Sequence, residues 1–110
     1  MTALIDQHCA PLPPASPCLT PAQWQALLGQ IDPAWSVIDG HHLERRYRLP
    51  DFASGLALVN RIGALAEAQD HHPDLLLGWG RVEITLWTHS VGGLSRNDFI
   101  LAAHIDSLTP

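Results

Sequence analysis

Lysine is absent from the sequence, and its six arginines stand against eleven acidic residues, which gives a formal net charge of −5. Without lysine, neither Schiff-base catalysis nor a P-loop for phosphate is available. A surface this acidic repels phosphate backbones, so we expect no nucleic-acid partner. No serine lies in a nucleophile elbow, which leaves serine hydrolysis without support.

Long apolar runs are also missing. None approaches the roughly 20 residues that span a bilayer, and the N-terminus lacks the basic start and apolar stretch of a secretory signal. We therefore expect a cytoplasmic protein with no membrane partner.

Cysteine is scarce, since Cys9 and Cys18 are the two that occur, both within the proline-rich first 18 residues. In the cytoplasm these side chains are expected to stay reduced thiols, and neither has a histidine at the spacing of a zinc site. Residues 1–18 carry no apolar periodicity, so they are predicted to form a flexible arm. Residues 19–110 then make one small domain.

Apolar periodicity predicts the element order α-β-β-α-β-β-α. The expected elements are a helix from Thr20-Pro21 to near Pro33, a hairpin of 35–38 and 43–49 around Asp39-Gly40, a helix from Asp51 to about Asp70, a hairpin of 75–77 and 81–89 around Gly78–Gly80, and a helix from Ser95 to about Leu108. This order is typical of an α+β fold, a four-stranded antiparallel sheet with its helices packed on one face. The opposite face or an edge is left for partners and substrate.

The long middle helix has a predicted buried stripe. Its members are Phe52, Leu56, Val59, Gly63 and Ala66. Gly63 would let the helix lie close to the sheet, and Glu67 falls on the flank of the stripe rather than on the solvated face.

The sequence contains seven histidines, among them the adjacent pair His71-His72 before Pro73. If the last two strands pair about Gly78–Gly80, the residue numbers of opposite positions sum to about 158, so position 89 lies opposite about 69. The sequence thus predicts that His71, His72 and His89 meet, with Glu67 nearby and with Trp79 and Trp87 as walls.

Three interpretations of these histidines stay open at this point. Imidazoles with a pKa near 6.5 suit general acid–base work, a set of three histidines suits zinc, and histidines at a junction also cap a helix and satisfy loop carbonyls. Asp98 likewise has two interpretations. It stands three residues after Ser95, as in a capping box, and a capping carboxylate can also orient a neighbouring histidine.

A longer pattern resembles a known family. Glu67-x₃-His71-His72-Pro73-x₅-Trp79-x₉-His89-x₈-Asp98 is similar to the signature of the pterin-4a-carbinolamine dehydratases. Supporting similarity covers most of residues 20–108. It includes Leu43-Glu44-Arg45, Phe52, residues 82–86, Thr88-His89, residues 92–95 and Asp98-Phe99. The arm lies outside the resemblance.

The resemblance implies a dehydratase that needs no metal and no organic cofactor. Its reaction would convert 4a-hydroxytetrahydrobiopterin to quinonoid dihydrobiopterin plus water, which recycles the cofactor of aromatic amino-acid hydroxylases. His71 and His89 would be the acid–base pair, and His72 would orient the pterin. Glu67 and Asp98 would set the tautomer or charge of the histidines, and we expect Trp79 to stack on the pterin ring.

The resemblance also bears on partners. Family members form dimers and tetramers, and a core as thin as this one favours self-association in any case. Some animal members act as a dimerisation cofactor of a transcription factor. A non-catalytic binding or assembly module on the same fold is therefore the alternative function.

Overall fold

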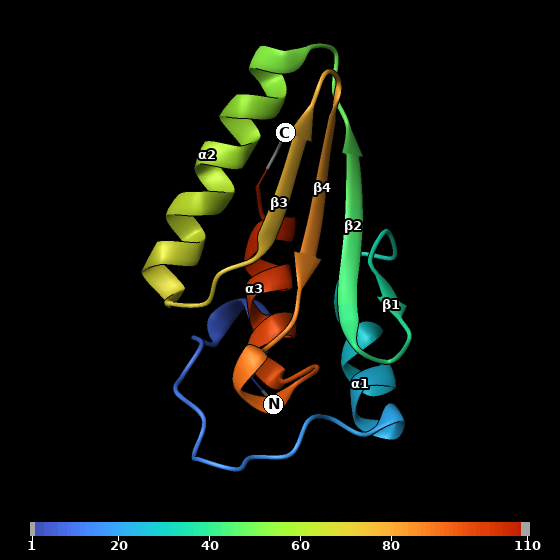
Figure 1. The fold of residues 1–110 in the computed structure, drawn as a ribbon, viewed down its shortest axis with the longest axis vertical. Coiled ribbons are helices and arrows are strands. Elements are labelled where there is room, and N and C mark those ends of the chain that lie inside the picture. The colour runs from blue at the N-terminus through green and yellow to red at the C-terminus, as the bar shows by residue number, and fades with distance from the viewer. Residues whose placement is uncertain (1, 109–110) are drawn as a thin grey trace.

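The computed structural model describes residues 2–108, and in it four antiparallel strands form one open sheet in the order β1-β2-β4-β3. The elements in chain order are a 3₁₀ turn η1 (Leu4–Asp6), α1 (Pro21–Leu28), β1 (Ser36–Ile38), β2 (His42–Arg48), α2 (Phe52–Gln69), β3 (Asp74–Gly78), β4 (Arg81–Leu86), a 3₁₀ turn η2 (His89–Val91) and α3 (Arg96–Asp106). Helices α2 and α3 pack against each other, and α2 packs along β3 and β4 (Figure 1). The predicted α+β fold and element order are confirmed.

Strict alternation builds the core side of the sheet. Leu43 and Tyr47 of β2 and Val82, Ile84 and Leu86 of β4 are buried beneath the helices. Their neighbours point to the opposite face, where Arg46 of β2 pairs with Glu83 of β4 at 2.9 Å between Nε and Oε1. Helix α3 supplies the other half of the core, because Phe99, Leu101 and Ile105 are 0% exposed.

The second hairpin forms close to its predicted register, but its last strand is shorter than expected. Asp74 pairs with Thr85 and Gly78 with Arg81, so opposite positions sum to 159. Gly80 takes a φ of +68° in the connecting turn, a conformation that glycine adopts without strain. The prediction of one strand from 81 to 89 was wrong beyond Leu86. The Thr88 N–H bonds to the Gly93 carbonyl at 2.8 Å, and His89–Val91 coil into η2.

Helix α2 has its predicted length, but its predicted stripe is only partly buried: Ala66 is buried and Val59 packs partly against the core, as predicted, whereas the start of the stripe is exposed. The buried residues of the helix are Gly55, Leu58, Ile62 and Ala66, whereas Phe52 and Leu56 are 44% and 43% exposed. The helix is apolar on more than one side, so periodicity alone could not choose between the stripes.

Because α2 faces the sheet with a side partly different from the one predicted, a different glycine contacts the sheet and Glu67 is exposed. A Cβ added at Gly55 would lie 2.8 Å from Leu77 Cδ1, so Gly55, not Gly63, is where the helix approaches the sheet. A Cβ added at Gly63 would meet no other part of the structure within 4 Å. The side chain of Glu67 is 81% exposed, so the prediction that it flanks the buried face was also wrong.

Helix α1 begins as predicted and ends early. The Gln23 N–H donates to Thr20 Oγ1 and the Thr20 N–H to Gln23 Oε1, which closes a capping box before Pro21. The helix stops at Leu28, and residues 29–35 turn instead of continuing to Pro33. In this turn the Ala34 N–H donates to Asp32 Oδ1 at 2.8 Å.

A partly buried ionic cluster ties α3 to the rest of the domain. The Arg45 guanidinium of β2 pairs with Asp106 at the end of α3, and the Trp35 indole N–H donates to Asp106 Oδ1 at 2.7 Å. Its carboxylate also accepts the Asp32 N–H at 2.9 Å. Among residues 2–108, no helix is long and apolar enough to span a membrane.

The N-terminal arm lies against the domain. Leu4 in η1 is 2% exposed and belongs to the core, and His104 Nε2 of α3 lies 2.9 Å from the Gln7 carbonyl oxygen. These are contacts with residues about a hundred positions away, which no local pattern indicates. The mobility of residues 1–18 stays a prediction.

Candidate functional site

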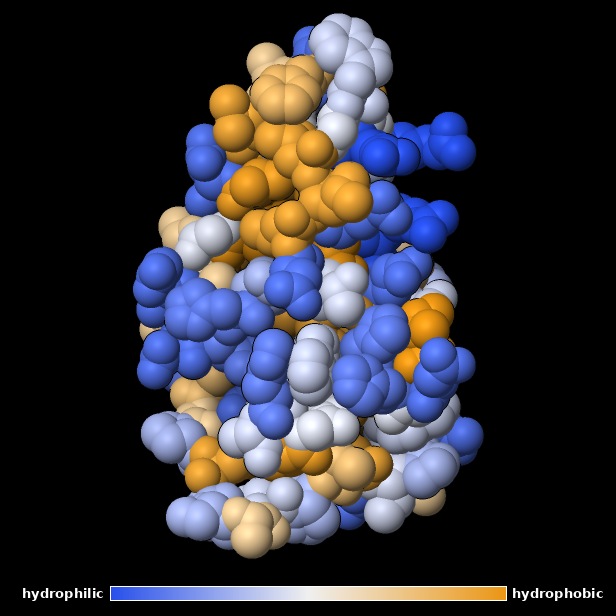
Figure 2. Space-filling view, viewed as in Figure 1, coloured by the Kyte–Doolittle hydropathy of each residue, from blue (hydrophilic) through white to orange (hydrophobic). Residues whose placement is uncertain are grey.

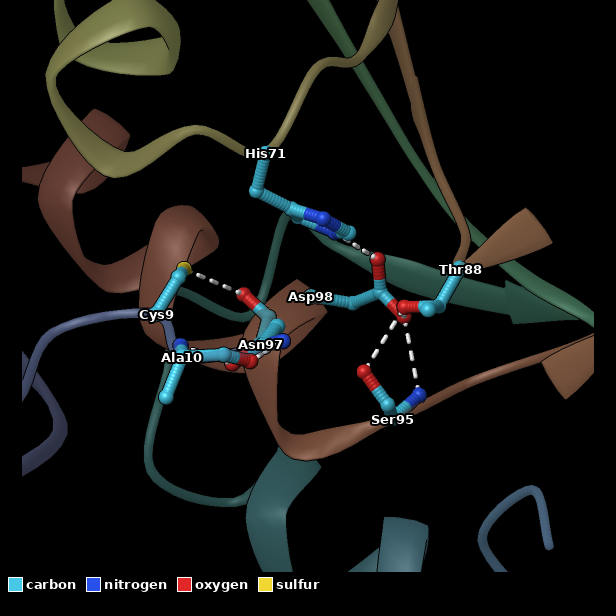
Figure 3. A network of polar contacts seen from close by, with 7 residues as sticks. All are labelled: Cys9, Ala10, His71, Thr88, Ser95, Asn97 and Asp98. Atoms are coloured by element: carbon cyan, nitrogen blue, oxygen red, sulfur yellow. Dashed lines mark hydrogen bonds and ion pairs between the residues drawn. The ribbon is translucent and has the colours of Figure 1, made fainter. Parts of the chain in front are cut away.

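Asp98 is the centre of a buried hydrogen-bond network. It is 0% exposed in the first turn of α3, and its Oδ2 accepts the Ser95 N–H at 2.9 Å and the Thr88 hydroxyl at 2.8 Å. The other oxygen, Oδ1, lies 2.6 Å from His71 Nε2 (Figure 3). The contact predicted from the capping-box spacing is therefore present, and the same carboxylate also binds a histidine.

The end of α2 places His71 beside Asp98. Asp70 caps the helix in the left-handed region with φ 51°, and the His71 N–H still bonds to the Ala66 carbonyl at 3.2 Å. The His71 side chain is only 11% exposed. In this contact a carboxylate oxygen that accepts from Nε2 fixes the tautomer with a proton on Nε2, and the second ring nitrogen, Nδ1, is not part of the contact.

A pocket of about 200 Å³ opens beside this pair. Its walls come from four separate segments: residues 9–12, residues 69–71, Thr88 with Ser90, and Asn97. His71 and Thr88 thus bring two members of the Asp98 network to the pocket surface. A small ligand there would meet an imidazole, hydroxyls and an amide on one side and apolar arm residues on the other.

The other predicted histidines have different surroundings. His72 Nε2 lies 3.5 Å from Glu67 Oε2, with both side chains largely exposed. The His89 ring stacks on Trp87 with 3.8 Å between centroids, and Trp87 also meets His41 at 4.6 Å. Within residues 2–108, no hydrogen bond or ring contact joins His89 to His71 or His72.

Two further predicted residues lie on or beside β3. Pro73 is half-buried in the extended link between His72 and β3. The turn between β3 and β4 lies at the far end of β3 from the link to α2 (Figure 1), and Trp79 is 75% exposed in this turn. Trp79 lines a separate shallow pocket with Arg46, Arg48 and Arg81, and it does not line the His71 pocket.

The residues that hold Asp98 and line its pocket include several that sequence reasoning did not assign. Thr88 and Ser95 bond to the carboxylate, while Cys9, Gln69 and Asn97 line or hold the pocket. Ser95 had a local signal as a helix cap. The other four act across the fold, so no short-range pattern could identify them.

Cys9 contributes a neutral thiol to this region. Burial raises its pKa from 9.0 to about 11, the charge of Asp98 raises it as well, and a hydrogen bond from the Leu101 backbone partly offsets both. The thiol donates to the Asn97 carbonyl at 3.3 Å. Cys9 therefore acts as a weak hydrogen-bond donor and not as a thiolate at neutral pH.

A zinc site would need three or more converging ligands. Across the described part of the chain, no group of three His, Cys, Asp or Glu side chains is arranged to hold a metal ion. His71 already binds Asp98 and His89 stacks on Trp87, so the histidines proposed for zinc lie in separate contacts.

Comparison with known proteins identifies the family of this chain. The family model described as "Pterin 4 alpha carbinolamine dehydratase" matches residues 17–108. A protein of Rubrobacter xylanophilus named "Putative pterin-4-alpha-carbinolamine dehydratase" is 44% identical over 108 residues, which are 98% of this chain and 100% of that one. A relative of the same name from Alkaliphilus metalliredigens is 42% identical over 96% of each chain.

Solved structures show the same fold. A crystal structure described as a transcriptional coactivator/pterin dehydratase from Brucella melitensis matches with a TM-score of 0.75 and 28% identity, covering 82% of this chain and 96% of that one. A pterin dehydratase-like protein, described as a RuBisCO assembly factor in the alpha-carboxysome, matches with a TM-score of 0.57 and 24% identity, covering 67% and 87% of the two chains. The second likeness concerns the fold alone.

Proposed function

The chain belongs to the pterin 4 alpha carbinolamine dehydratase family, and on that premise we propose that it converts 4a-hydroxytetrahydrobiopterin to quinonoid dihydrobiopterin plus water. This reaction would recycle the pterin cofactor of aromatic amino-acid hydroxylases. A hydroxylase is thus the proposed functional partner. The observation that carries the proposal is the buried His71–Asp98 pair at 2.6 Å on the wall of a small pocket.

The reaction needs one acid and one base. The bond from C4a to its hydroxyl oxygen breaks, and this oxygen takes a proton and leaves as water. N5 gives up its proton, and the electron pair of its N–H bond forms the C4a–N5 double bond. Protons balance, so two groups that titrate near neutral pH suffice, and no redox step occurs.

His71 has the geometry of one of these groups. Asp98 fixes the ring orientation and tautomer, and a buried carboxylate stabilises the imidazolium that forms when Nδ1 takes a proton. Thr88 and Ser95 hold the carboxylate in turn, so the pair costs little reorganisation during turnover.

His89 is our proposed second acid–base group. It lies between Thr88 and Ser90, which both line the pocket, and its neighbour Thr88 is bonded to Asp98. His72 follows His71 directly and is proposed to orient the pterin, and its Nε2 lies 3.5 Å from Glu67 Oε2. Neither role needs a metal or an organic cofactor.

The test is dehydration of chemically made 4a-hydroxytetrahydropterin, followed against the spontaneous rate. We expect wild-type turnover above that rate and losses of about 10²-fold or more in kcat for His71→Ala and for His89→Ala. His42→Ala is the matched control, since His42 bonds only to His41 outside the pocket. A wild-type rate equal to the spontaneous one would contradict the function, and full activity of His89→Ala would remove that residue from it.

A non-catalytic assembly or dimerisation module is the second candidate. The Brucella melitensis neighbour is described by both roles, coactivator and dehydratase. An assembly surface, however, has no use for a buried carboxylate that orients an imidazole on a pocket wall. That pair is the reason to rank catalysis first.

Self-association is part of the proposal. Strand β3 is an edge strand on which Leu76 is 46% exposed, and Phe52 and Leu56 of α2 are exposed as well. Apolar side chains gather over the start of α2 and the end of β3 (Figure 2). A second copy of the chain would cover them, which makes a homodimer or homotetramer the expected state.

We also propose a cytoplasmic location, because the free thiols of Cys9 and Cys18 suit the reducing conditions there.

A further inference from the structure

The N-terminal arm supplies one wall of the His71 pocket. Cys9, Ala10, Pro11 and Leu12 line it from one side, facing His71 and the hydroxyl residues Thr88 and Ser90 on the other. The arm residues at this wall are mostly apolar. The catalytic side of the pocket is polar, so the arm is what gives a ring compound an apolar surface to pack on.

Paired hydrogen bonds hold this wall in place. The Ala10 N–H donates to Asn97 Oδ1 at 3.1 Å, and Asn97 Nδ2 donates back to the Ala10 carbonyl at 2.8 Å (Figure 3). The Cys9 N–H donates to Gln69 Oε1 at 2.8 Å. An asparagine that bonds both to the N–H and to the C=O of one residue acts like the edge of a strand and fixes the backbone of the arm.

The anchors are neighbours of the proposed catalytic residues. Asn97 directly precedes Asp98 on α3, and Gln69 lies two residues before His71 at the end of α2. The arm therefore bridges the two elements whose side chains form the His71–Asp98 pair. Beyond the pocket, Arg96 Nε donates to Gln7 Oε1 at 2.8 Å, and Leu4 is buried in the core.

We propose that residues 9–12 are a specificity-determining wall of the substrate pocket, held there by Asn97 and Gln69, which admits the pterin ring and disfavours a long substituent on it. The inference rests on the proposed function, because it concerns the substrate of that same pocket.

The size of the pocket carries the second half of this proposal. Its volume of about 200 Å³ is below the roughly 300–1,000 Å³ common for small-molecule sites. A bicyclic ring with a short substituent fits such a space with little change. A substituent as long as the aminobenzoylglutamate of folates exceeds this volume. Where it meets residues 9–12 it has to push them aside, and this breaks the hydrogen bonds from Asn97 and Gln69 that hold them.

The first experiment compares two substrates on variants of the wall. The probes are 4a-hydroxytetrahydropterins that carry a methyl or an aminobenzoylglutamate substituent at C6. We expect wild type to favour the methyl compound at least about tenfold in kcat/KM, and Leu12→Ala to narrow this ratio several-fold by lowering KM for the larger one. The matched control is Ser16→Ala, because Ser16 belongs to the same arm but bonds only to Pro13.

The second experiment releases the wall. Asn97→Ala removes both side-chain hydrogen bonds to Ala10, so KM for the methyl compound should rise about tenfold while kcat stays within about twofold. A fall in kcat with unchanged KM would mean that Asn97 acts on Asp98 instead and would overturn its role as an anchor of the wall.

A readout without turnover separates the two proposals. Cys9 is a half-buried member of the wall and Cys18 is exposed, so alkylation of Cys9 relative to Cys18 reports how firmly the arm is held. We expect the ratio to rise in Asn97→Ala and to fall when a saturating non-reactive pterin is added to wild type. An inactive wild type with Cys9 still protected would end the dehydratase proposal alone. Active wild type with no change in substrate ratio, KM or Cys9 protection in the variants would end the wall proposal alone.

Discussion

At the scale of single residues, Asp98 does two tasks with one carboxylate. One oxygen closes the start of α3 through the Ser95 N–H and the Thr88 hydroxyl, and the other holds His71. Asp98 is 0% exposed and its partners include Thr88 and His71 on other segments, so a change that leaves these partners unpaired is costly. Removing the side chain of Asp98 would therefore disturb the fold and the activity together, whereas replacing its carboxylate by an amide can separate the two roles.

Asp98→Asn should keep most of the fold and lose most of the activity. Its amide oxygen can still accept from Ser95 and Thr88, but its NH₂ group then faces His71 Nε2, which has to become the acceptor. The ring is left in the wrong tautomer, so we expect kcat to fall about 10²-fold or more. Stopped-assay kinetics measure this, with the thermal unfolding midpoint as the control for folding. Activity within threefold of wild type would show that the carboxylate only caps the helix.

Cys9 gives a pH prediction with a definite sign. Its pKa rises from 9.0 in an exposed thiol to about 11 in the fold, chiefly because burial disfavours the thiolate. Between pH 9 and 11 the unfolded chain therefore releases this proton before the folded one, and the free energy of unfolding falls as pH rises. Below pH 9 the thiol has no effect on the pH dependence.

The measurement is the alkylation rate of Cys9 against pH in a Cys18→Ser background. We expect the rate to keep increasing up to about pH 11, whereas a thiol with its ordinary pKa would level off near pH 9. Levelling near pH 9 in the folded protein would mean that the arm leaves Cys9 in water.

At the scale of elements, α2 depends on which of its glycines faces the sheet. Gly55 lies where Leu77 of β3, Leu49 and Val82 of β4 come close, and Gly63 lies in open space. Both positions are inside the same helix, where alanine is intrinsically better than glycine by roughly 0.5–1 kcal/mol. The two sites thus differ in packing and not in helix propensity.

Gly63→Ala should raise the free energy of unfolding by up to about 1 kcal/mol. Gly55→Ala gains the same propensity but puts a methyl group 2.8 Å from Leu77 Cδ1, so it should be less stable than Gly63→Ala by about 1 kcal/mol or more. Urea denaturation of both variants measures the difference. Equal stabilities would mean that Leu77 moves aside freely and that α2 is not held close to β3 at Gly55.

At the scale of the whole molecule, several large apolar side chains stay exposed to water. Phe52, Leu56 and Leu76 are more than 40% exposed on α2 and on the edge strand β3. Burying these exposed apolar side chains against a second copy removes them from water, which favours self-association.

Leu56→Glu should shift the chain toward monomer. It places a charge in the proposed interface without touching the core, since Leu56 is 43% exposed, so the unfolding midpoint of the monomer should change little. Light scattering after size exclusion, over a range of concentrations, measures the mass of wild type and variant. The matched control is Ala57→Glu, which adds the same charge at another exposed position of α2. Identical masses for wild type and Leu56→Glu would move the interface elsewhere or remove it.

Much of the fold could be read from local patterns. Thr20-Pro21, Asp51 and Ser95 mark helix starts, and the alternation from Val82 to Leu86 marks the buried face of β4, because caps and strand pleats depend on residues a few positions apart. The family resemblance likewise came from residues at fixed spacing, and the matching family model confirms it.

The sequence by itself determined the element order, the α+β class and the family, since these follow from local periodicity, capping and motif spacing. Only the tertiary structure decided which stripe of α2 is buried, that β4 stops at Leu86, that His89 stacks on Trp87, and that the arm lines the pocket of His71. The physical reason is that each of these depends on contacts between segments far apart in the chain. Local sequence patterns allow more than one arrangement at each of these places, and the contacts made in the packed fold select one of them.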